Sequence, residues 1–172
     1  MQQYDPAQHG FDDPVIACVQ MEPHVGEKHE NVLRAIRHIE TAAQNGASLV
    51  VLPELANSGY VFEDRDEAFS LAEALPHGES AQRIGEAAQR LGVYIMHGIA
   101  ERDGTKLYNS ALFVGPRGPV GVYRKLHLWH DEKRFFEAGD LGVPVFDTPL
   151  GRVAVAICYD VEFPEVARAA AR

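Results

Sequence analysis

The chain has 172 residues, of which 46% are hydrophobic and 24% are charged, so it can form one globular domain with a substantial core. Its formal net charge of -9 argues against a nucleic-acid binder, because binding phosphates requires a basic face. No apolar run approaches the roughly 20 residues that span a membrane, and Cys18 and Cys158 are too few for a disulfide framework. We therefore expect a cytoplasmic protein without membrane or nucleic-acid partners.

Strands and helices alternate in the first part of the chain. Residues 1–13 are polar, lack the charged and apolar regions of a signal peptide, and are expected to form a loose leader. Continuous apolar runs predict strands at 15–20, 48–52 and 93–99. The first two are expected to be buried, and the strand at 15–20 is expected to be covered on both faces. Apolar residues that recur every three or four positions predict amphipathic helices at 28–45 and 80–91, and a short helix is expected at 67–74. Gly46 and Ser80 are expected to cap the two longer helices.

Hairpins replace this alternation beyond Gly98. A turn at 115–118 separates the strands expected at 108–114 and 120–123. A second turn at 147–151 separates the strands expected at 143–146 and 152–157, and an alanine-rich helix is expected at 165–172. This order of elements predicts an α/β (α+β) fold in a single domain over 14–172, with a mixed sheet and helices on at least one face.

Three strand-like segments each end in a residue that can take part in chemistry: Glu54, Lys125 and Cys158. A carboxylate at a strand end is as often solvated as functional, but a semi-buried Glu54 would have a raised pKa and could act as a general base. A lysine after a strand is usually a surface residue, yet an ammonium beside a thiolate stabilises both the thiolate and a nearby oxyanion.

Cys158 follows the apolar residues 155–157 and precedes a polar, acidic turn. Free cysteines are most often buried apolar fillers, which is our expectation for Cys18 in the middle of its strand. At Cys158, a chain that turns into a helix would direct amide N–H groups at the thiolate, lowering the thiol pKa and forming an oxyanion hole. The sequence therefore favours Cys158 as a nucleophile.

Histidines offer two alternatives to a site made of Glu, Lys and Cys. His127-x-x-His130 has the spacing of half a metal site, but no second Cys/His pair accompanies it, so structural zinc is disfavoured. A Cys–His catalytic pair that uses His127 or His97 carries more weight, because histidine is the commonest base for a cysteine.

Short motifs follow one another in order along the chain: Leu52-Pro53-Glu54, Ser58-Gly59-Tyr60, Tyr108-Asn109-Ser110, Tyr123-Arg124-Lys125-Leu126-His127-Leu128, Phe136-Glu137-Ala138-Gly139-Asp140, Cys158-Tyr159-Asp160 and Phe163-Pro164-Glu165. As an ordered set they resemble the nitrilase, or carbon–nitrogen hydrolase, superfamily. The likeness covers nearly everything after Pro14, and the pattern around Lys125 looks more like the amidase-like branches than the strict nitrilases.

The resemblance implies an α-β-β-α sandwich with mixed sheets and helices on its outer faces. It implies hydrolysis of the non-peptide carbon–nitrogen bond of a small amide, carbamoyl compound or nitrile. Glu54 would be the base, Cys158 the nucleophile that forms a thioester, and Lys125 with the Tyr159 backbone N–H the oxyanion partners. Glu132 is the best match to a further glutamate that positions substrate. Water completes the reaction, and neither a metal nor an organic cofactor is implied.

The resemblance also implies that the C-terminal part of the domain is missing, because relatives continue well beyond the nucleophile with further strands, helices and pocket residues. Unpaired strand edges and an uncovered apolar face would follow. The expected function is an amidase-type hydrolase that is homo-oligomeric in its intact form. The alternative is a catalytically inactive truncated domain that acts only as an association module.

Overall fold

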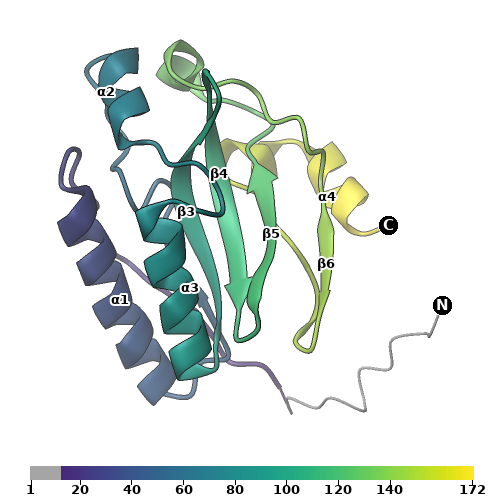
Figure 1. Ribbon diagram of the computed structural model, residues 1–172. Helices are drawn as coiled ribbons and strands as arrows, with labels where there is room; N and C mark the ends of the chain where they lie inside the picture. Colours follow the sequence, from purple (N-terminus) through teal and green to yellow (C-terminus); the bar gives the residue numbers. More distant parts are fainter. Residues whose placement is uncertain (1–12) are drawn as a thin grey trace.

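Two amphipathic helices form where the spacing of apolar residues predicts them. The structure, a computed structural model, describes residues 13–172, and the leader expected at 1–13 lies outside this range except for its last residue. Helices α1 (Lys28–Gln44) and α3 (Glu79–Leu91) each bury one stripe of side chains. Figure 1 shows the two helices side by side against one face of a sheet.

None of the helices within 13–172 combines the length and the apolar character needed to cross a membrane.

A five-stranded sheet with the order β1-β2-β3-β4-β5 forms the centre of the fold. Strands β1, β2 and β3 are parallel neighbours connected through helices, whereas β3, β4 and β5 are antiparallel neighbours. This mixed sheet with helices confirms the predicted α/β fold class. The strands are β1 (Ile16–Cys18), β2 (Leu49–Val51), β3 (Tyr94–Asp103), β4 (Lys106–Gly115) and β5 (Gly118–Arg124).

Three expectations for the first part of the chain are wrong. β1 was expected to be covered on both faces, but it is an edge strand in which Ile16 is 57% exposed. Cys18, expected to be a buried filler, is exposed, because side chains alternate along a strand and only Ala17 faces the helix-covered core. Ser80 does not cap α3, which begins after Gly78; its hydroxyl donates to the Glu73 carboxylate instead.

The main apolar core lies between the sheet and the two long helices. Full burial of an aliphatic side chain contributes about 1.5–3 kcal/mol, so this layer holds the sheet and helices in a fixed arrangement. Its fully buried members are Ala35, Ile39, Val50, Ala56, Ile84, Ala88, Ile95 and Ile99.

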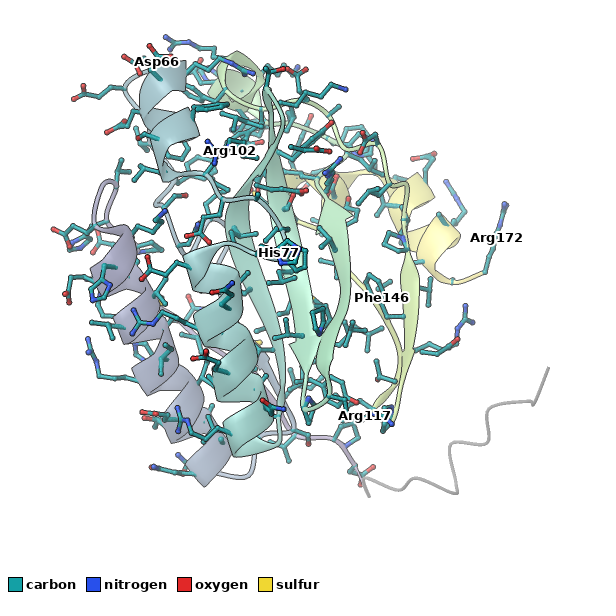
Figure 2. All side chains as sticks on the ribbon, viewed as in Figure 1. Asp66, His77, Arg102, Arg117, Phe146 and Arg172 are labelled. Carbon is teal, nitrogen blue, oxygen red and sulfur yellow. The ribbon has the colours of Figure 1, made fainter. Side chains whose placement is uncertain are left out.

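A second, two-stranded sheet covers part of the opposite face. Its strands β6 (Val145–Thr148) and β7 (Gly151–Ala154) form the hairpin that the sequence predicts. Figure 2 shows Phe146 between β6 and β5, where a Cβ on Gly121 would lie 2.2 Å from the ring. An open apolar groove of about 450 Å³ remains beside the hairpin, and its lining includes Ile16, Val51, Met96 and Val153.

Shorter helices complete the chain: α2 (Arg65–Leu71), the 3₁₀ helices η2 (His130–Arg134) and η3 (Cys158–Glu162), and α4 (Pro164–Ala170). The sequence predicts α2 and α4 with shifted ends; α4 starts at a proline, which fits the first turn of a helix. The two 3₁₀ helices are not predicted, and they carry residues of the site described next.

Candidate active site

Lys125 lies between two carboxylates directly after β5. Its Nζ donates to Glu54 Oε1 over 2.6 Å and to Glu132 Oε1 over 2.8 Å, and the lysine side chain is 0% exposed. Burial lowers the pKa of Lys125, but the hydrogen bonds and charges of Glu132 and Glu54 outweigh this effect and raise the pKa above its usual value. The ammonium is therefore charged at neutral pH. The structure thus brings together three of the side chains that the sequence singles out.

Glu54 is positioned by a close approach of two backbones. The chain after β2 runs beside β3, where the Ala56 N–H donates to the Gly98 carbonyl over 2.9 Å. A Cβ on Gly98 would lie 2.1 Å from the Pro53 carbonyl oxygen and 2.8 Å from the Glu54 Cα, so a larger residue would displace the glutamate. The next residue, Leu55, has a φ of +48°, a strained value for a non-glycine residue.

The Lys125 backbone is held from both sides. Its N–H donates to the Asn109 carbonyl over 2.8 Å, and its carbonyl accepts from the Gly139 N–H over 2.8 Å. The Asn109 side chain also enters the site, where its Nδ2 donates to Glu54 Oε1 over 2.6 Å and to Glu132 Oε1 over 3.3 Å. Asn109 therefore orients both carboxylates around the lysine.

Glu132, in η2, is the carboxylate of this group with the most partners. Beyond its bonds to Lys125 and Asn109, its Oε1 accepts from the Tyr60 hydroxyl over 2.7 Å and its Oε2 from the Trp129 N–H over 2.7 Å. Burial and the hydrogen bond to Glu132 raise the pKa of Tyr60, which therefore stays a donor at neutral pH. Sequence reasoning did not single out Tyr60 or Asn109 as site residues, although both lie in the motifs that carry the family resemblance.

Cys158 is the first residue of η3, and its φ of +46° places it in the left-handed region, where strain is common at functional turns. The residue is exposed. Partial burial of the thiol and the charge of Glu54 raise its pKa, and the opposing charge of Lys125 does not compensate. The lowered thiol pKa expected from the sequence is therefore wrong, because burial of the thiol and the charge of Glu54 together outweigh the ammonium of Lys125.

Asp160 joins η3 to the segment that follows β5, and its side chain is fully buried. Its Oδ1 lies 2.9 Å from both the backbone N and the ring Nδ1 of His127. Its Oδ2 accepts from the Tyr123 hydroxyl over 2.6 Å and from the Ile157 N–H over 3.0 Å. The His127 ring also stacks on Phe163, with ring centroids 3.6 Å apart. These contacts hold the cysteine turn beside the lysine segment.

The histidine alternatives gain no support from this geometry. His97 is fully buried, its two ring nitrogens have no partner among residues 13–172, and burial lowers its pKa to about 4. The groups that shift the thiol pKa of Cys158 are carboxylates and Lys125. Over the same range, His, Cys, Asp and Glu side chains form no group of three or more that could hold a metal. His127 and His130 each contact an aspartate instead.

A pocket of about 450 Å³ opens beside the thiol and is lined by Trp129, Cys158, Tyr159 and Glu162. The backbone N–H of Tyr159 donates to no acceptor within the described chain, residues 13–172. The exposed Cys158 thiol lies at this pocket, and its pKa is shifted by the charges of the buried Lys125 ammonium and of Glu54, the carboxylate that Lys125 contacts. This set of groups can support acyl transfer through a thioester.

A sequence profile of the family described as carbon–nitrogen hydrolase matches residues 15–172, a range that includes every predicted site residue. Among curated relatives, the nitrilase of Pyrococcus abyssi is 51% identical over 153 residues, which cover 89% of this chain and 58% of the relative. The omega-amidase NIT2 of Homo sapiens is 40% identical over 152 residues, which cover 82% of this chain and 53% of the relative. The chain thus spans between half and three fifths of these two proteins.

Solved structures show the same architecture. Nit3 of Saccharomyces cerevisiae, a member of branch 10 of the nitrilase superfamily, matches with a TM-score of 0.80 and 30% identity over 91% of this chain and 59% of that structure. A carbon–nitrogen hydrolase of Helicobacter pylori G27 matches with a TM-score of 0.79 and 27% identity over 91% of this chain and 55% of its own.

Proposed function

The chain belongs to the carbon–nitrogen hydrolase family, and we propose that it hydrolyses the non-peptide carbon–nitrogen bond of a small amide, carbamoyl compound or nitrile through a cysteine thioester. The observation that carries this proposal is the meeting of three groups. Lys125 Nζ lies 2.6 Å from Glu54 Oε1, and the pKa of the Cys158 thiol responds to both. The three residues follow β2, β5 and β7, so their convergence depends on the tertiary fold.

In the first half-reaction with an amide, Glu54 accepts the thiol proton of Cys158 while the sulfur attacks the carbonyl carbon. Because the thiol pKa is raised, the proton leaves as the bond to carbon forms rather than beforehand. The carbonyl electrons move to oxygen, where the Lys125 ammonium and the Tyr159 N–H stabilise the negative charge. The carbon–nitrogen bond then breaks, and the leaving nitrogen takes the proton from Glu54, which gives ammonia or an amine.

Water completes the reaction. Glu54, again a carboxylate, accepts a proton from water as the water oxygen attacks the thioester carbon. The carbon–sulfur bond breaks, the acid leaves, and the sulfur of Cys158 takes its proton back from Glu54. Glu132 contributes by holding Lys125, since its buried carboxylate already accepts from the lysine, Tyr60 and Asn109. Direct contact of Glu132 with substrate, which the family resemblance implies, stays a prediction.

Ammonia release from small primary amides tests the mechanism. We expect Cys158→Ala to abolish release without unfolding the chain, because alanine removes only an exposed thiol. Cys18→Ser removes the other exposed thiol and serves as the matched control that retains turnover. Mass spectrometry of the chain quenched during turnover should find the acyl group on Cys158. Unchanged ammonia release from Cys158→Ala would refute the thioester mechanism.

The second candidate is an inactive domain that acts only as an association module, and the open apolar groove beside β7 is the observation that favours it. An association module predicts no acyl group on Cys158 after incubation with any amide, whereas the hydrolase predicts one. The cytoplasmic location and the homo-oligomeric state of the intact protein stay predictions.

A further inference from the structure

The pocket beside Cys158 combines an aromatic wall with one charged residue. Its lining consists of Trp129, Cys158, Tyr159 and Glu162. In the proposed reaction the attacked carbon lies against the Cys158 sulfur. The rest of the acyl group therefore extends among the other three side chains, and their chemistry decides which acyl groups bind.

Trp129 and Tyr159 form the wall, with ring centroids 4.7 Å apart and an interplanar angle of 65°. Phe163 supports Tyr159 edge-on at 5.2 Å. Trp129 is 51% exposed, so a large part of its indole is available to a ligand. The face of an aromatic ring carries negative electrostatic potential and attracts a cation more strongly than a neutral group of the same size.

The charges around the pocket favour the same kind of ligand. The Lys125 ammonium is paired with Glu54 and Glu132 and does not line the pocket, so no cationic side chain is part of the lining. Glu162 is exposed. Arg168, in the helix that follows, pairs with Glu165 at 3.2 Å, and Glu162 has no ion-pair partner in the stretch from 13 to 172.

We propose that this pocket selects amides whose acyl group carries a cation such as an ammonium, held by the Glu162 carboxylate and the faces of Trp129 and Tyr159. The inference rests on the proposed hydrolase function and names its substrate class. The same carboxylate repels acyl groups that end in a carboxylate. An exposed ion pair and a cation–π contact together correspond to a preference of about tenfold in kcat/KM over a neutral amide of the same shape.

Three amides with the same spacer test the substrate class: γ-aminobutyramide, valeramide and glutaric acid monoamide end in an ammonium, a methyl and a carboxylate. We expect kcat/KM of the 172-residue chain to fall in that order, with about tenfold between the first two at low ionic strength. Glu162→Gln should reduce this ratio to about threefold, the part due to the aromatic faces. Asp131→Asn is the matched control, because Asp131 is an exposed carboxylate near Trp129 that lines a different pocket.

Hydrolysis of valeramide as fast as γ-aminobutyramide would overturn the inference and leave the proposed function standing. The inference would also be overturned if Glu162→Gln left the ratio of the two kcat/KM values unchanged, or if Asp131→Asn reduced that ratio as much as Glu162→Gln does. Hydrolysis of none of the three amides would count against the proposed function itself.

A second measurement does not depend on turnover. Cationic and anionic methanethiosulfonate reagents form a mixed disulfide with the Cys158 sulfur and release a sulfinate, and mass spectrometry of the Cys18→Ser chain follows both reactions. We expect the cationic reagent to react about tenfold faster, and Glu162→Gln to remove most of that difference. Equal rates would overturn the inference whether or not an amide is hydrolysed. If the Cys158 thiol prefers the cationic reagent but the chain hydrolyses no amide, the result would support the pocket's preference and count against the proposed function.

Discussion

The two halves of the candidate site are held in place by different means. The charged half, made of Glu54, Lys125 and Glu132, is largely buried, and each member is hydrogen-bonded to another. The elbow half, the turn that begins at Cys158, is exposed, and the buried carboxylate of Asp160 holds its backbone. A buried charge needs a partner because leaving water is costly, whereas a thiol that is neutral at rest can lie at the surface. Mutations can therefore disrupt either half separately.

The largest effect is expected when the charged half loses its cation. Lys125→Met leaves Glu54 and Glu132 buried without a counter-ion, which should lower the free energy of unfolding by about 3–5 kcal/mol. Urea denaturation at neutral pH measures this loss. Lys133→Met, at an exposed position in η2, is the matched control and should change stability by less than about 0.5 kcal/mol. Equal stability of the two variants would show that the charged half is not held by its ion pairs.

The charged half can also be displaced without removing a charge. In Gly98→Ala the new Cβ would lie 2.1 Å from the Pro53 carbonyl oxygen, so the backbone that carries Glu54 must move. We expect a loss of about 3 kcal/mol of stability, the upper end for overpacking, and a fall in turnover of about a hundredfold from the misplaced base. Gly85→Ala is the matched control: its Cβ meets no atom within 4 Å in helix α3, so stability should rise by about 0.5–1 kcal/mol. Full turnover in Gly98→Ala would show that Gly98 does not determine the position of Glu54.

The elbow half depends on Asp160. The two carboxylate oxygens of Asp160 take part in four hydrogen bonds, and Asp160→Asn removes the charge and replaces one oxygen with an amide donor. This should cost about 2 kcal/mol and speed amide hydrogen exchange around Ile157. The charged half does not contact Asp160, so exchange at the Lys125 N–H should change less. Tyr123→Phe removes the donor to Asp160 and the acceptor of a long, 3.4 Å bond from the Leu126 N–H, and it should cost about 1 kcal/mol. If Asp160→Asn were no more destabilising than Tyr123→Phe, residues other than Asp160 would hold the elbow half in place.

Local signals in the sequence account for the parts that could be predicted. The three- and four-residue spacing of apolar side chains predicts α1, and the interruption of apolar runs singles out Glu54, Lys125 and Cys158. The fold class followed from the same signals, because helix and strand periodicities differ and their order limits the topology.

Contacts between distant segments account for the rest. Tyr60 and Asn109 reach carboxylates 72 and 55 positions away, and although both lie in family motifs, local hydrophobicity and spacing do not indicate these distant contacts. Gly98 fits within an expected strand, and its role appears only where another backbone crosses it. The prediction for Cys18 failed because local hydrophobicity cannot tell an edge strand from a central one. The thiol pKa of Cys158 was assigned the wrong direction because the sign of its shift depends on how far the fold buries the thiol and on which distant charges it brings nearby.

The smallest expected effect is on the reactivity of the Cys158 thiol, and it tests how the two halves influence each other. The negative charge of Glu54 raises the pKa of the Cys158 thiol, so Glu54→Gln should lower that pKa and increase the thiolate fraction at neutral pH. Alkylation of Cys158 by iodoacetamide, measured against pH in a Cys18→Ser chain, should therefore be faster than in the parent at neutral pH and converge with it at high pH. Hydrolysis should nevertheless be lost, because glutamine cannot accept the thiol proton. Glu165→Gln removes an exposed carboxylate of the following helix and should leave both rates unchanged. Slower alkylation together with lost hydrolysis would mean that Glu54 holds the cysteine turn in place, and that the two halves share a structural rather than an electrostatic connection.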